Sequence, residues 1–120
     1  MDQRWKFPQT NQVGVALVED KLLDKDFMPG GNLADYEQKG KKYQLFLVRT
    51  GSGEEALGLL LSLRKGLSQA KFVAHMGGYY GMDGKTPMYT FQKGPYLAGV
   101  LGLPEVEADL LARQFAARLN

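Results

Sequence analysis

The stretch that decides the fold is residues 72–103, which read FVAHMGGYYGMDGKTPMYTFQKGPYLAGVLGL. Aromatic and β-branched residues alternate here with small ones, and Asp83-Gly84 is a dipeptide typical of tight hairpin turns. A second tight turn is predicted at Lys93-Gly94. The stretch therefore predicts neighbouring strands of an antiparallel sheet, and these carry His75, the only histidine of the chain.

The two turns predict a register. It places Tyr80 opposite Pro87 and Tyr89 opposite Ala98, and alternate side chains then face opposite sides of the sheet. We expect helices to pack on the face formed by Phe72, Ala74, Met76, Tyr80, Tyr89, Phe91, Tyr96, Ala98 and Val100. The other face carries Val73, His75, Tyr79, Met88, Thr90, Gln92, Leu97 and Leu101, and it is more apolar than a solvated face requires. A bulge at Gly77-Gly78 would exchange the two faces.

Two helices are predicted, near 54–66 and 104–119. The first begins with a capping box, in which Ser52 accepts from a free helix amide and Glu55 reaches back. The second begins at Pro104, and acidic residues follow where the helix dipole favours them. Both have an apolar stripe at helical spacing. The stripe of the first includes Leu57 and Leu61 beside Ala56, Leu60, Leu63 and Leu67.

The first half of the chain predicts strands at 13–18, 33–37 and 43–48, with a loop over 24–32. Residues 43–48 are apolar on both faces, as in a strand that is covered on both sides. Residues 1–11 form an N-terminal arm that holds Trp5 and Phe7. We therefore predict a single α+β domain over residues 1–120. It is a two-layer sandwich with an antiparallel sheet of about four to six strands and both helices on one face.

Composition narrows the possible functions. A chain of 120 residues can bury roughly two-thirds of its unfolded surface. The absence of cysteine excludes disulfides, thiolate catalysis and cysteine-ligated metals. The net charge of +2 argues against nucleic acid as a partner. No apolar run approaches the roughly 18 residues of a transmembrane segment.

No reaction can be assigned from the sequence. His75 has neither a nucleophile nor a carboxylate near it in its segment. No phosphate-binding loop is present, and we expect no cofactor, metal or catalytic residue. The expected function is a non-catalytic accessory or binding domain for a protein partner or a small apolar ligand. Its expected contact residues, all on the second face, are His75, Tyr79, Met88, Leu97 and Leu101.

Three alternatives stay open. The arm with Trp5 and Phe7 could cover the second face. A homodimer could use Leu97 and Leu101 on that face. The chain could also bind a soft metal through His75 and Met76 with Met82 and Met88 nearby, although only Met88 shares the predicted face of His75, or a nucleic acid single strand through the tyrosines.

Several short motifs carry a resemblance to a known group of proteins. They are YQLFLVR at 43–49, Glu55-Ala56, GGYYG at 77–81, FQKGPY at 91–96 and ADLLARQFA at 108–116. Together they resemble a family of uncharacterised bacterial proteins, usually exported and often lipid-anchored, over about residues 33–119. The resemblance implies a two-layer α+β fold and a location outside the cytoplasm, and it implies no activity. Residues 1–10 lack the apolar centre of a signal peptide, so an exported form is expected to have lost its leader.

Overall fold

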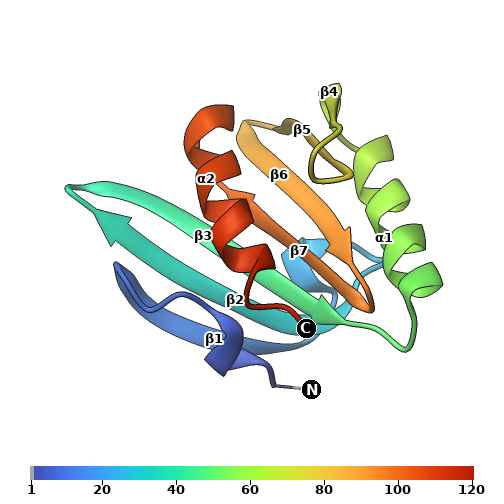
Figure 1. Ribbon diagram of the computed structural model, residues 1–120, viewed down its shortest axis with the longest axis horizontal. Helices are drawn as coiled ribbons and strands as arrows, with labels where there is room; N and C mark the ends of the chain where they lie inside the picture. Colours follow the sequence, from blue (N-terminus) through green and yellow to red (C-terminus); the bar gives the residue numbers. More distant parts are fainter. Residues whose placement is uncertain (1) are drawn as a thin grey trace.

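The computed structural model describes residues 2–120 as one seven-stranded antiparallel sheet with two helices packed against it (Figure 1). The strands lie in the order β1-β2-β3-β7-β6-β5-β4. Their bounds are β1 Gln12–Asp20, β2 Pro29–Gln38, β3 Lys41–Arg49, β4 Ser68–Val73, β5 Gly78–Asp83, β6 Thr86–Lys93 and β7 Tyr96–Leu101. The helices are α1, Gly53–Lys65, and α2, Glu105–Ala116, and the short 3-10 helices are η1, Arg4–Lys6, and η2, Leu22–Asp24. The α+β class is confirmed, but the sheet is larger than the four to six strands predicted.

Part of the additional sheet comes from residues predicted as a loop. β2 begins at Pro29, because Gly30 and Gly31 lie inside the sheet and not in a turn. A Cβ on Gly30 would clash with the carbonyl oxygen of Glu19, and one on Gly31 would lie 2.5 Å from the carbonyl oxygen of Leu47. These glycines therefore permit close approach of neighbouring strands, a use that sequence alone does not separate from a turn.

The two helices pack on opposite faces of the sheet, so the prediction of one shared face is wrong. On β3, Leu45 and Leu47 belong to the core that includes Ala108, Ala112 and Phe115 of α2. Their neighbours Phe46 and Val48 belong to the core that includes Leu60 and Leu63 of α1. The fold therefore has three layers, because the apolar residues on both faces of β3 and β7 need a cover.

Each hairpin turn lies one residue later than predicted. The turn residues are Gly84-Lys85 and Gly94-Pro95, which pair Tyr80 with Tyr89 and Phe91 with Ala98. Both glycines have positive φ, 63° and 56°, so glycine is the first turn residue and not the second. The shift moves each pairing by two positions, and residues of β5, β6 and β7 keep their predicted faces.

The strand predicted from residue 72 onward is interrupted by a turn. Residues 74–77 form this turn between β4 and β5, and Val73 pairs with Gly78 while Phe72 pairs with Tyr79. Phe72 therefore lies on the α1 face and Val73 in the α2 core, the reverse of the prediction. The alternation of faces restarts after the turn, which explains the error.

Candidate functional site

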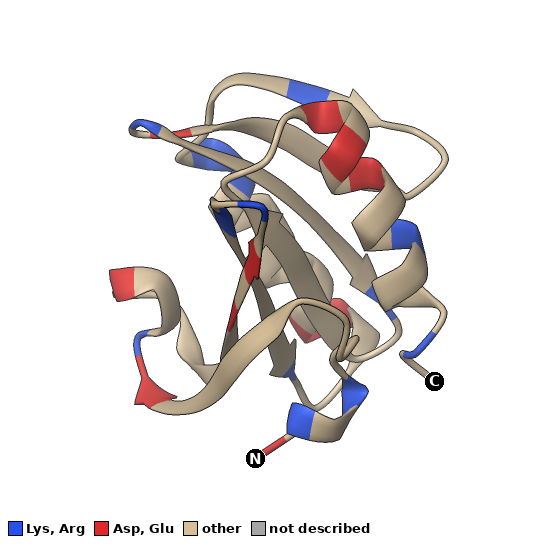
Figure 2. Cartoon of the chain, turned by 90° about the vertical axis from the view of Figure 1, so that its left-hand side faces the viewer, with Lys and Arg blue, Asp and Glu red and all other residues tan. Residues whose placement is uncertain are grey.

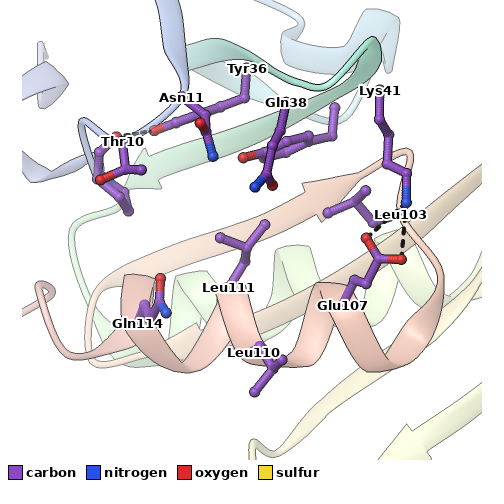
Figure 3. Close-up of a pocket in the computed structure, with 12 residues that line it drawn as sticks. Thr10, Asn11, Tyr36, Gln38, Lys41, Leu103, Glu107, Leu110, Leu111 and Gln114 are labelled. Atoms are coloured by element: carbon purple, nitrogen blue, oxygen red, sulfur yellow. Dashed lines mark hydrogen bonds and ion pairs between the residues drawn. The ribbon is translucent and has the colours of Figure 1, made fainter.

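A cavity of about 340 Å³ lies between α2 and β2 (Figure 3). We call it the α2 groove. It is lined by Pro8, Thr10, Asn11, Tyr36, Gln38, Lys41, Tyr43, Leu103, Glu107, Leu110, Leu111 and Gln114. The sequence did not indicate it, because its lining comes from the arm, β2, β3 and α2.

The sheet side of the groove is aromatic. Tyr36 and Tyr43 are directly opposite on β2 and β3, and their rings stack with centroids 5.2 Å apart and planes 10° apart. Both residues are largely buried. The Tyr36 hydroxyl donates to the carbonyl oxygen of Pro8 at 2.5 Å, which fixes the arm beside the groove. Burial raises the pKa of Tyr36, so this hydroxyl stays neutral at physiological pH.

The rim of the groove carries neutral polar groups. The side-chain amides of Asn11, Gln38 and Gln114 make no hydrogen bond to any other described residue of the chain. Figure 3 shows Gln38 extending from β2 toward α2, and Leu111 extending from α2 toward the strand. An amide rim around apolar walls can bind a ligand that has both an apolar body and hydrogen-bonding groups.

One ion pair closes an end of the groove. Lys41 Nζ lies 3.0 Å from a carboxylate oxygen of Glu107, and both side chains are about half exposed. An exposed pair of this kind adds little stability. Because these are the only charged residues of the lining and they pair with each other, the groove is close to neutral.

A second polar cluster surrounds Asp109 on α2. Its Oδ1 lies 2.6 Å from His75 Nε2 and also accepts a hydrogen bond from the Tyr89 hydroxyl. Its Oδ2 accepts from Arg113 Nε at 2.9 Å. Burial alone would raise the pKa of Asp109, but the hydrogen bonds from Tyr89 and His75 and the charge of Arg113 together outweigh burial and hold that pKa below its usual value. Burial, and then the bond to Asp109, raise the pKa of Tyr89 far above its usual range.

The structure therefore supplies the carboxylate that His75 lacks in its own segment. His75 and Asp109 are 34 positions apart, so no local pattern connects them. The only pattern that involves Asp109 is its spacing of four from Arg113, which places both on one face of a helix. Within residues 2–120 no Ser, Thr or Lys side chain is hydrogen-bonded to His75. The contact joins the turn at 74–77 to α2, and we assign it no reaction.

The five residues predicted to make contacts do not form one site. Met88, Leu97 and Leu101 are buried in the core beneath α1, and Tyr79 is half-buried at the edge of that core. His75 lies on the other side of the sheet, against α2. A metal site that combines His75 with Met88 is therefore wrong, because the sheet separates them.

The cover of the second face also differs from the expectation. α1 covers it, whereas Phe7 of the N-terminal arm packs on Phe115 of α2, with ring centroids 5.1 Å apart. Across residues 2–120, no group of three or more His, Cys, Asp or Glu side chains is placed to hold a metal ion. No helix in the same part of the chain is long and apolar enough to cross a membrane.

No protein-family model matches this chain, and no curated protein matches its sequence significantly. The resemblance noted from short motifs therefore has no support beyond those motifs.

Proposed function

We propose that this chain is a non-catalytic binding domain whose α2 groove holds a small neutral ligand with an apolar ring. The supporting observation is the combination of the stacked Tyr36–Tyr43 wall with the free side-chain amides of Asn11, Gln38 and Gln114. Leu111 and the small accessible parts of Tyr36 and Tyr43 contact the ring, and the amides bind polar groups at its edge.

The shape of the groove favours a compact ligand. A volume of about 340 Å³ is near the lower end of the range for small-molecule sites. The Lys41–Glu107 pair closes one end, which disfavours an extended peptide that continues past α2. The neutral lining disfavours a charged ligand, whose desolvation would not be offset.

Titration with small ring compounds tests the proposal. We expect benzamide or indole to shift the backbone amide NMR signals of groove residues such as Gln38, Tyr43 and Leu111, with weak affinity. The variant Gln38→Trp places a large ring in the groove and should abolish the shifts. In the control variant Glu37→Trp, the neighbouring exposed residue on the opposite face of β2 is changed, and binding should persist.

Two results would contradict the proposal. One is a set of shifts that avoids the groove residues, and the other is binding that survives in Gln38→Trp. Native mass spectrometry of protein purified without denaturation adds an independent measurement, because a retained neutral ligand appears as extra mass that Gln38→Trp removes.

A further inference from the structure

Four basic side chains gather around Tyr96 at one end of the sheet. Arg49, Tyr96 and Lys93 form one row across β3, β7 and β6, so their side chains share the α2 face. Lys6 Nζ of η1 lies 5.3 Å from the centroid of the Tyr96 ring, and Arg49 Cζ lies 5.8 Å from it. Two cations therefore lie within 6 Å of the centre of the same ring.

The end of α2 brings the fourth cation to this row. Arg118 donates from Nε to the carbonyl oxygen of Lys6 at 2.7 Å and from a terminal nitrogen to that of Trp5 at 3.1 Å. Lys93 Nζ donates to the carbonyl oxygen of Ala116 at 2.7 Å. These bonds fix the arm and the end of α2 against the sheet. Trp5 beside them is 64% exposed.

We call Lys6, Arg49, Lys93 and Arg118, together with Trp5, the basic patch. None of its four cations forms an ion pair within residues 2–120, whereas Arg4, Lys21, Lys25, Lys41, Lys71 and Arg113 do. The chain has 15 Lys and Arg against 13 Asp and Glu, so the residues outside the patch have 11 against 13. Figure 2 shows basic segments near both chain ends and acidic segments on the first turns of α2. The four cations of the patch therefore carry more positive charge than the whole chain carries net.

We propose that the basic patch binds the surface of a membrane containing anionic phospholipids, with Trp5 at the level of the headgroups. Tryptophan suits this region because its ring is apolar and its N–H remains hydrogen-bonded there. Each Lys or Arg near an anionic surface raises affinity roughly fivefold. Four cations and one exposed indole supply both contributions in one place.

The same patch fits a nucleic acid less well. Binding of single strands needs exposed aromatic rings on which successive bases stack. Tyr96 is only 3% exposed and two cations already lie against its ring. Trp5 is then the one exposed ring of the patch, and one ring does not form a stacking platform.

Trp5 also provides the probe, because it is the only tryptophan of the chain. The protein is titrated with phosphatidylcholine vesicles that contain or lack phosphatidylglycerol. We expect a blue shift of Trp5 emission and co-sedimentation only with the anionic vesicles, and both should be lost at high salt. Equal binding to the two vesicle types, or no binding to either, would overturn the proposal.

Charge variants locate the contact. The double variant Arg49→Gln, Lys93→Gln should lower vesicle affinity roughly twenty-five-fold, since each cation contributes about fivefold. The matched control Lys39→Gln, Lys42→Gln removes the same charge from exposed positions at the β2–β3 turn and should leave affinity nearly unchanged. An equal loss in both double variants would contradict the patch. If Trp5 emission shifts to the blue with a single-stranded oligonucleotide and not with vesicles, the patch binds a nucleic acid and the membrane proposal is wrong. Melting curves confirm that each variant is folded.

Discussion

The hydroxyl of Tyr89, at the centre of the sheet, donates a hydrogen bond to the carboxylate of Asp109 on α2. Tyr89 is fully buried, and Asp109 is the acceptor that satisfies its hydroxyl. Asp109 also binds His75 and Arg113, so one carboxylate connects the sheet, the 74–77 turn and the helix. The bond therefore sets how α2 lies on the sheet, and α2 forms one wall of the groove.

Asp109→Ala is expected to lower the free energy of unfolding by about 1–3 kcal/mol, since it leaves the Tyr89 hydroxyl without its acceptor. Tyr89→Phe removes the donor and should cost about 1–2 kcal/mol. Urea denaturation measures both. Because the two changes remove the same bond, the double variant should cost less than the sum of the single ones.

Glu107→Ala is the control for this pair. Glu107 lies on the same helix, but its partner Lys41 is exposed, so the loss should stay below about 1 kcal/mol. An Asp109→Ala variant as stable as the wild type would show that the Tyr89–Asp109 bond does not hold α2 in place.

Acid should weaken the wild type more than Asp109→Asn. The pKa of Asp109 is lower in the folded protein than its usual value of 3.8. A carboxyl with a lowered folded pKa stabilises the protein above its unfolded pKa, and this contribution disappears as the pH falls through the folded value. The difference in unfolding free energy between the two proteins should therefore shrink from about pH 5 to pH 2. A difference that is constant over this range would show that the ionised state of Asp109 does not contribute.

Local signals in the sequence were enough to predict α1, α2 and β3. Ser52 caps α1 by accepting from the backbone N–H of Glu55 at 3.2 Å, and Leu45 to Val48 are buried on both faces of β3. A strand that is apolar on both faces already required a cover on each side of the sheet. The prediction that both helices share one face was wrong. Helical periodicity shows which side of a helix is buried, but it does not show on which face of the sheet the helix packs.

The α2 groove could not be predicted in the same way. The helix α2 packs on β6 and β7, and the sheet continues past it through β3 to β2. The groove lies between the helix and these further strands, so it depends on the strand order and not on any motif. Asp109 has no local signal for its role, because His75, which the 74–77 turn brings to it, is 34 positions away in the sequence. Long-range neighbours of this kind leave no trace in local spacing.

Leu60→Ala and Leu61→Ala test whether α1 covers the second face of the sheet. The residues are adjacent and chemically identical, but Leu60 is 1% exposed and Leu61 is 42% exposed. We expect Leu60→Ala to cost about 2–5 kcal/mol and Leu61→Ala less than about 1 kcal/mol. Comparable losses at the two positions would favour the stripe predicted from sequence, in which both are buried.

Gly99→Ala tests the close packing at the centre of the sheet. A Cβ on Gly99 of β7 would clash with the ring of Phe46 and lie 2.7 Å from the carbonyl oxygen of Tyr89. The ring is enclosed in the α1 core and the carbonyl belongs to β6, so neither can move freely. We expect the free energy of unfolding to fall by about 1–3 kcal/mol, the usual cost of overpacking.

Gly58→Ala is the control, since a Cβ there meets no atom within 4 Å and alanine favours the helix. That variant should be as stable as the wild type or slightly more so. The measurement is the melting temperature of each variant. If Gly99→Ala melts at the same temperature as Gly58→Ala, Phe46 has room to turn away.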